Sequence, residues 1–181
     1  MTLDEIIAAR QSCRSYDPSR PVSKEALSAL IESARLAPSA CNSQTWRFVV
    51  VTDRTMLDTI HAEGMRMGVG NNFLKEAPAL IIGCSKLDLL ANTVGRTISG
   101  IDYYQVDLGI AMEHMVLKAT ELGLGTCWIG WFHEKSIKKL LGIPRGVKIT
   151  ALLSVGYPKQ GDPLREKKRK ATEEIAMWEK W

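Results

Sequence analysis

The stretch DYYQVDLGIAMEHMVLKATELGLGTCWIGW, residues 102–131, decides the fold, because it predicts a long buried helix that leads directly into a strand. We expect the helix over Asp102–Leu122, where apolar residues fall on most sides of the helix and not on a single stripe. These residues are Val106, Ile110, Met112, Met115, Val116, Leu117, Ala119 and Leu122. Gly123 can adopt the left-handed conformation that ends a helix, and Thr126–Trp131 then has the composition of a strand. A helix that is apolar all round needs cover on every side, which the interior of a monomer or a second copy of the chain could supply.

Strands and helices alternate on both sides of this segment. Short apolar runs rich in β-branched residues predict three further strands, over Trp46–Val51, Ala79–Cys84 and Val147–Val155. Helical spacing and capping residues predict helices over Leu3–Arg10, from Ser23 to Pro38, from Asp53 onward and over Ser136–Leu141. These elements favour a sheet between helices, in an α+β or α/β arrangement.

Size and composition favour one globular domain over residues 1–181, with a basic C-terminal tail at 159–181. The chain has 181 residues and 45% of them are hydrophobic, which suffices for one core. No apolar stretch approaches the ~20 residues of a membrane span, and no signal-peptide pattern opens the sequence. We therefore expect a cytoplasmic protein without a membrane partner.

Several catalytic classes lack their sequence signals. The cysteines and histidines show no metal-ligand spacing, so we expect no metal site; they are Cys13, Cys41, Cys84, Cys127, His61, His114 and His133. No G-x-G-x-x-G follows a strand, no G-x-x-x-x-G-K phosphate loop is present, and no serine stands in a G-x-S-x-G turn. Rossmann dinucleotide binding, P-loop chemistry and serine hydrolysis are therefore poorly supported.

Two groups of alternating basic residues are candidates for binding an anion. Arg10, Ser12 and Arg14 alternate within one turn of irregular chain, so two guanidinium groups and a hydroxyl can converge on one phosphate. Lys167 and Arg169 repeat the alternation near the other end of the chain. Each group could instead solvate a helix end or a surface, and the basic run 167–170 could also contact nucleic acid.

The segment Pro38–Trp46 carries small and amide side chains into a predicted strand. Asn42 and Gln44 offer both hydrogen-bond donors and acceptors, which suits recognition of a ring that bears alternating carbonyl and N–H groups. A capped turn would account for the same residues. We expect core positions for Trp46, Trp128 and Trp131, since such side chains are more often buried in a core than stacked on a cofactor.

Together these features resemble the FMN-dependent nitroreductase family, from about Ile6 to the C-terminal tail. The resemblance rests on four motifs that follow the family's order. They are R-x-S-x-[RK] at Arg10–Arg14, A-P-S-x-x-N-x-Q-x-W at Ala37–Trp46, a central helix followed by G-L-G-T-x-W-I-G at Ala119–Gly130, and G-Y-P at Gly156–Pro158 before a basic K-x-R. Four motifs in this order are hard to obtain by chance.

The resemblance implies an α+β, nitroreductase-like fold with a central mixed sheet flanked by helices. Two subunits would interlock through their central helices as a homodimer and bind two FMN molecules at the interface. On the family pattern, the FMN phosphate and ribityl chain would be held by Arg10, Ser12, Lys167 and Arg169, and Arg14 would stabilise the anionic reduced ring. The expected cofactor-binding set also includes Gln11, Pro38, Ser39, Ala40, Asn42, Gln44, Asn71, Ile129, Gly130 and Trp131.

Two parts of this set have expected positions against the flavin ring. The segment Pro38–Asn42 would come from the other subunit, and the backbone around Ile129–Trp131 would donate an N–H to flavin N5, where hydride arrives and leaves. Larger relatives cover the substrate pocket with a helical excursion; the corresponding region here, about residues 86–100, is short, so we expect an open pocket. Asn71 aligns loosely with a ring-contacting asparagine of the family.

The implied activity is a ping-pong oxidoreduction. NAD(P)H would reduce FMN and leave, and a nitroaromatic, quinone or similar small acceptor would then take two electrons, with no side chain acting as a nucleophile. Related flavin chemistry, either reductive dehalogenation or oxygen-dependent flavin fragmentation, is one alternative. A flavin-binding or nucleic-acid-binding module without turnover is another, suggested by the basic tail; we expect no nucleic-acid partner.

Overall fold

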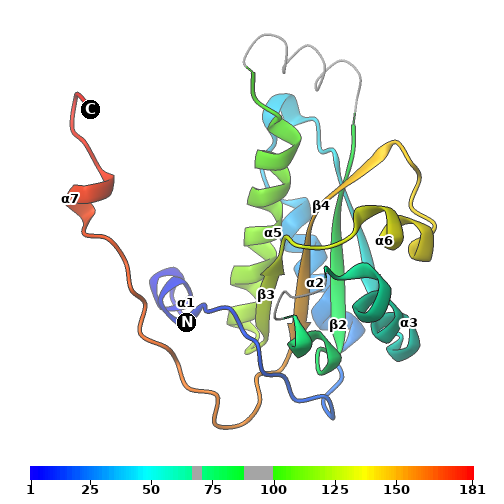
Figure 1. Ribbon diagram of the computed structural model, residues 1–181. Coiled ribbons are helices and arrows are strands. Elements are labelled where there is room, and N and C mark those ends of the chain that lie inside the picture. The colour runs from blue at the N-terminus through cyan, green and yellow to red at the C-terminus, as the bar shows by residue number, and fades with distance from the viewer. Residues whose placement is uncertain (67–70, 88–99) are drawn as a thin grey trace.

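A 19-residue helix, α5 (Tyr103–Glu121), runs along one face of a four-stranded sheet in the computed structural model, which describes residues 1–66, 71–87 and 100–181 (Figure 1). The strands are β1 (Trp46–Val51), β2 (Ala79–Lys86), β3 (Gly125–Ile129) and β4 (Val147–Gly156), in the order β1-β2-β4-β3. The predicted α+β class and all four predicted strands are confirmed.

The expectation of a mixed sheet needs one correction. All three pairings between the named strands are antiparallel, and within the part of the chain that the structure describes the one parallel pairing is an isolated bridge between Ser12 and Thr126. The reason is the route of the chain, because β4 returns between β2 and β3 and runs against both. The hydrophobic period of a strand does not encode its direction.

Helices cover both faces of the sheet, which gives three layers (Figure 1). Alternate residues of β2 point into two separate cores: Ala79 and Ile81 pack with α2 (Lys24–Arg35) and α5, whereas Leu80 and Ile82 pack on the other side. The second core is closed by short helices, namely α3 (Arg54–Thr59), η2 (Ile60–Gly64), η3 (Asn72–Lys75) and α6 (Glu134–Leu141). A sheet buried on both faces explains why β2 is almost continuously apolar.

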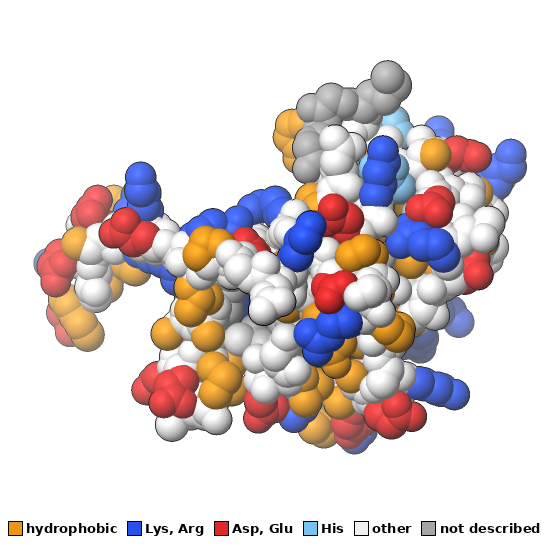
Figure 2. All heavy atoms as spheres, turned by 90° about the horizontal axis from the view of Figure 1, so that it is seen from below, with side chains coloured by type: hydrophobic (Ala, Val, Ile, Leu, Met, Phe, Trp, Pro, Cys, Tyr) orange, Lys and Arg blue, Asp and Glu red, His pale blue; other side chains and the backbone are white. Residues whose placement is uncertain are grey.

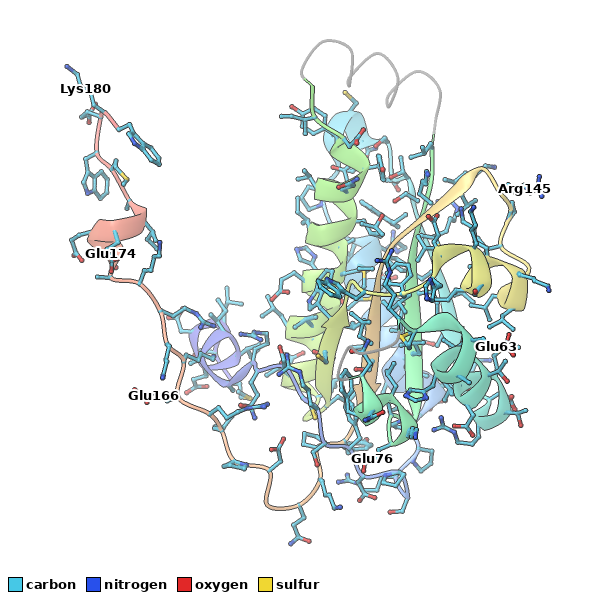
Figure 3. All side chains as sticks on the ribbon, in the orientation of Figure 1. Glu63, Glu76, Arg145, Glu166, Glu174 and Lys180 are labelled. Atoms are coloured by element: carbon cyan, nitrogen blue, oxygen red, sulfur yellow. The ribbon has the colours of Figure 1, made fainter. Side chains whose placement is uncertain are left out.

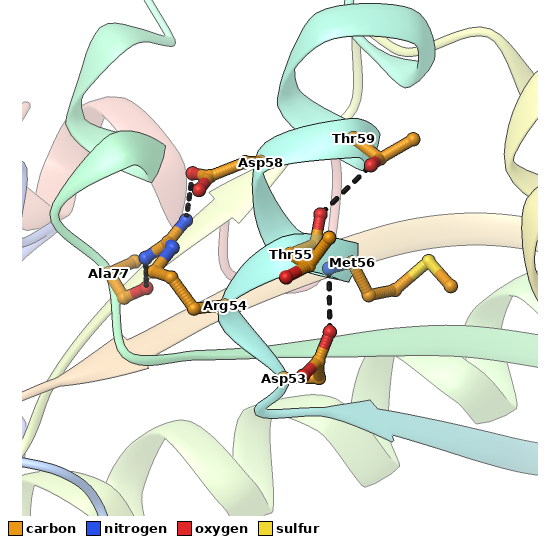
Figure 4. Close-up of polar contacts among 7 residues, drawn as sticks. All are labelled: Asp53, Arg54, Thr55, Met56, Asp58, Thr59 and Ala77. Carbon is orange, nitrogen blue, oxygen red and sulfur yellow. Dashed lines mark hydrogen bonds and ion pairs between the residues drawn. The ribbon is translucent and has the colours of Figure 1, made fainter.

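Polar contacts fix α3 against the start of β2 (Figure 4). The Asp53 carboxylate caps the helix by accepting the Met56 N–H at 2.8 Å, as predicted from the sequence. Arg54 donates to the Ala77 carbonyl at 3.1 Å and pairs with Asp58 at 2.7 Å. These contacts hold the second core in place beneath β2.

Helix α5 has one row of apolar side chains that its own chain covers incompletely. Its inner faces are buried against the sheet and α2, but Val106 is 48% exposed, and Ile110 and Leu117 are only partly covered. The prediction of a helix buried on all sides is therefore not met within one chain. Val106, Ile110 and Leu117 stand at i, i+4 and i+11 and so form an apolar row on a single helix face.

The chain after Pro158 leaves the sheet, passes α1 (Leu3–Ala9) and ends beyond α7 (Thr172–Ile175), well apart from the body (Figure 1). In Figure 2 this segment projects from the body and carries hydrophobic side chains at its end. Figure 3 places Glu174 and Lys180 along it, away from the sheet. Trp178 is 86% exposed and Trp181 is fully exposed.

The described ranges contain neither a membrane-spanning helix nor a cluster of metal ligands. Of the helices in them, none combines the length and apolar character that crossing a bilayer requires. Within the same ranges, no three histidine, cysteine or acidic side chains gather as metal ligands. The expected open pocket near residues 86–100 lies mostly outside the described residues.

Candidate functional site

Six basic side chains from the two ends of the chain surround one hollow of about 380 Å³. They are Arg10, Arg14, Arg165, Lys167, Lys168 and Arg169, and the hollow is completed by Gln11, Ser12 and Glu166. The predicted phosphate-binding residues, which lie more than 150 positions apart in the sequence, are thus brought together. Arg165 was missed, although it extends the alternation of Lys167 and Arg169 by one step.

Hydrogen bonds join the C-terminal segment to the N-terminal loop. The Gln11 side chain accepts the Arg165 N–H at 3.0 Å and donates to the Pro163 carbonyl at 3.2 Å. The Arg165 guanidinium donates to the Ser12 carbonyl, and the Lys167 ammonium donates to the carbonyls of Ile7, at 2.8 Å, and of Ala8. Lys167 thereby neutralises the negative end of α1. These hydrogen bonds fix the two sides of the hollow to each other.

The charge in the hollow is strongly one-sided. Partial burial, together with the positive charges of Arg10 and Arg169, lowers the pKa of Lys167. Glu113 of α5 lines a neighbouring pocket that also contains Arg10, and burial raises the pKa of its carboxyl, against the opposing effects of Arg10 and of a hydrogen bond from Trp128. Crowded cations repel one another, so an anion with several acceptor oxygens would be stabilised here.

The edge strand β3 supports the N-terminal loop. Ser12 bridges to Thr126, and the Cys13 N–H donates to the Thr126 carbonyl at 2.8 Å. Burial raises the pKa of the Cys127 thiol, against the opposing effect of Arg14 beside it. Gly125 permits this contact, because a Cβ there would lie 2.6 Å from the Cys13 Cβ. A side chain at position 125 would push the loop away from the sheet.

Gly125→Ala should therefore reduce both stability and anion binding. Overpacking of this kind costs about 1–3 kcal/mol of unfolding free energy, which is measured by denaturant unfolding. Gly146→Ala is the matched control, because a Cβ at Gly146 meets no atom within 4 Å. Unchanged stability and unchanged anion affinity in Gly125→Ala would show that the loop does not depend on this close approach.

The other end of β3 leads to a second group of predicted residues. The strand ends at Ile129, two residues earlier than predicted, so Gly130 and Trp131 lie in the following loop. Trp46 is buried as expected, but Trp131 is 65% and Trp128 39% exposed, so the expectation of a core position is wrong for these two. Since β3 is an edge strand with alternating faces, Trp128 points outward between buried neighbours.

Asn71 lies close to this loop. It is buried, and its amide approaches the Met65 sulfur at 3.9 Å, while Met65 bridges to Phe132. The predicted residues Ile129–Trp131 and Asn71 therefore belong to one end of the sheet. The basic hollow lies beside the start of β3, roughly 13 Å away at the rise of an extended strand.

The predicted loop Pro38–Gln44 stands apart from the hollow, because none of its residues lines it. It contains η1 (Ala40–Asn42), and its φ angles are +51° at Cys41, +52° at Asn42 and +44° at Gln44. The left-handed region costs non-glycine residues about 1–2 kcal/mol each, although Asn tolerates it better. Strain of this kind clusters at functional sites.

A buried carboxylate on α5 accepts hydrogen bonds from this loop. Asp107 is only 3% exposed, and it accepts the Ala40 N–H at 2.9 Å and the Ser43 hydroxyl at 3.4 Å. Sequence reasoning did not single out Asp107, since a lone acidic residue in a helix gives no distinctive signal. Within the loop, Gln44 donates to the Asn42 side chain at 2.9 Å.

Comparison with known proteins agrees with this architecture. The family described as "Nitroreductase family" matches residues 7–157. A protein of Archaeoglobus fulgidus, provisionally named an NADH dehydrogenase/NAD(P)H nitroreductase, is 32% identical over 181 residues, covering 98% of this chain and 97% of its own.

Two solved structures extend the likeness. A nitroreductase family protein from Clostridium difficile 630 superposes over 100% of both chains with a TM-score of 0.84 and 27% identity. An FMN-dependent nitroreductase from Clostridium difficile R20291 has a TM-score of 0.76 and 28% identity, covering 97% of this chain and 98% of its own.

Proposed function

This chain belongs to the nitroreductase family, and we propose that it is an FMN-dependent oxidoreductase that passes electrons from NAD(P)H to small organic acceptors. The observation that carries the proposal is the basic hollow, where six cationic side chains and the Ser12 hydroxyl face one space. An FMN-dependent relative with the same fold supports the choice of cofactor.

The donor set of the hollow fits a phosphate monoester. Guanidinium groups bind phosphate oxygens in pairs, and lysine adds a point charge. Arg10, Ser12, Lys167 and Arg169 would hold the phosphate and ribityl chain, with Arg165 as a further contact. Nucleic acid is a poorer fit, because the cations converge on a hollow and do not spread along an extended surface.

FMN would supply the two-electron chemistry. The chain's own residues would bind and orient it: the loop at Gly130 and Trp131 would present backbone N–H groups to the ring, with Asn71 nearby. Arg14, in the hollow, would place positive charge near the pyrimidine side of the ring, where reduction adds negative charge. No side chain needs to act as a nucleophile.

A homodimer is part of the proposal, and two exposed surfaces support it. The apolar row of α5 and the tryptophans of the C-terminal segment would both be covered by a second copy. The interface should exceed ~2,000 Å². The loop Pro38–Gln44, which does not join the hollow of its own chain, would contact the flavin of the partner.

Anaerobic mixing with NADH or NADPH tests the proposed function. The purified protein should be yellow, and its absorbance near about 450 nm should bleach with the nicotinamide and return when a nitroaromatic or quinone is added. A bound flavin that neither nicotinamide bleaches would contradict the proposal and favour a binding module without turnover. Recovery by halogenated aromatics alone, with halide release, would instead assign reductive dehalogenation.

A further inference from the structure

The loop Ser39–Gln44 needs support from outside itself. Cys41 and Gln44 adopt a left-handed backbone conformation that residues with side chains rarely take. Such conformations persist only where surrounding contacts over-determine them. Internal hydrogen bonds, such as the Ser39 hydroxyl accepting the Gln44 N–H at 3.0 Å, link the two ends of the loop but do not attach it to the body.

Asp107 provides that attachment at the start and middle of the loop, and the Arg47 guanidinium donates to the Gln44 carbonyl at 3.1 Å at its end. The two carboxylate oxygens of Asp107 accept from Ala40 and Ser43, which flank the left-handed residues Cys41 and Asn42. The carboxylate is almost fully buried and sits on the long helix α5, so its position is fixed. The Ala40 N–H is partly buried, and leaving such a group without its acceptor is costly, so we expect the loop to relax to another conformation without this carboxylate.

We infer that Asp107 is a positioning residue for flavin-ring recognition, which holds Ser39–Gln44 in the shape that presents its small and amide groups to the ring. The inference rests on the proposed function, since it takes this loop to be the ring-contacting segment. Asp107 is adjacent to Val106 of the exposed apolar row. The helix that would join the two subunits therefore also holds the conformation of the loop that would contact the partner's flavin.

Titration of the full-length protein with FMN and with riboflavin separates ring recognition from phosphate recognition. Riboflavin has the same ring and lacks the phosphate. Asp107→Ala should weaken the binding of both ligands by the same factor, about tenfold, because the contacts to the flavin ring are disturbed. Asp107→Asn should stay within about threefold of the wild type, since its amide oxygen can still accept the Ala40 N–H. Arg10→Ala should weaken the binding of FMN and leave the binding of riboflavin unchanged.

Leu57→Ala is the stability control. Leu57 is buried in the core on the opposite side of the sheet, so its truncation destabilises the fold without touching the loop, and flavin affinity should stay as in the wild type. An equal loss of flavin affinity in Leu57→Ala and Asp107→Ala would overturn the inference, because the effect would then follow general stability.

Other outcomes are equally decisive. Asp107→Ala with wild-type affinity for both ligands, or with a loss confined to FMN, overturns the inference. If Asp107→Ala fails to fold, Ser43→Ala decides: a loss of about two- to threefold for both flavins supports the role, and no loss overturns it. A wild-type protein that binds neither flavin would refute the proposed function itself, which keeps the two failures distinguishable.

Discussion

Arg10→Ala should weaken FMN binding about tenfold to a hundredfold while leaving the fold intact, and Arg169→Ala should do the same. Each variant removes a charge-assisted contact worth roughly 1.5–3 kcal/mol of binding free energy. Both side chains line the hollow. Because neighbouring contacts to one phosphate are coupled, the double variant should lose less than the sum of the two.

Quenching of flavin fluorescence measures the dissociation constants for this series. Arg145→Ala is the matched control, because Arg145 is an exposed arginine after α6 and does not line the hollow (Figure 3). Its affinity for FMN should equal that of the wild type. If Arg10→Ala and Arg169→Ala also keep wild-type affinity, the phosphate is not bound in this hollow.

Val106→Glu should raise the dimer dissociation constant by a factor of about a hundred or more. Val106 is 48% exposed in one chain, so the single fold can accept a carboxylate there. In a two-fold dimer through α5 the same carboxylate would be buried without a partner, at a cost of about 3–5 kcal/mol, which corresponds to about two to four orders of magnitude in the dissociation constant.

Thr55→Glu is the control for that variant, since it adds the same charge on the exposed side of α3, in the opposite layer. Thr55→Glu should remain dimeric, while Val106→Glu should become monomeric at low concentration and release its flavin. Dilution series followed by light scattering report the masses. A Val106→Glu protein that stays dimeric with full flavin would place the interface elsewhere.

Side-chain spacing was the best guide to which residues the fold brings together. The alternation of Arg10, Ser12 and Arg14, repeated by Lys167 and Arg169, identified residues that the fold brings around one hollow. Arg165 stood one step outside the expected pattern. Its position depends on the hydrogen bonds that it donates to Gln11 and Ser12, and spacing in the sequence does not show these bonds.

Features that depend on three-dimensional neighbours escaped prediction. Tryptophan is a residue type usually found in the core, but Trp131 follows the end of an edge strand and is mostly exposed. The antiparallel direction of β4 follows from chain route and not from periodicity. Asp107 became visible only when the structure placed its carboxylate against the strained turn at Cys41.

Sedimentation of the wild-type protein, followed by protein absorbance and by flavin absorbance near about 450 nm, tests the central claim most directly. The claim is that FMN binds in sites built by two copies of the chain. Both signals should move together at twice the 20.1 kDa chain mass, with one flavin per chain. Flavin that sediments with a 20.1 kDa monomer, or a dimer without flavin absorbance after saturation with FMN, would contradict the account.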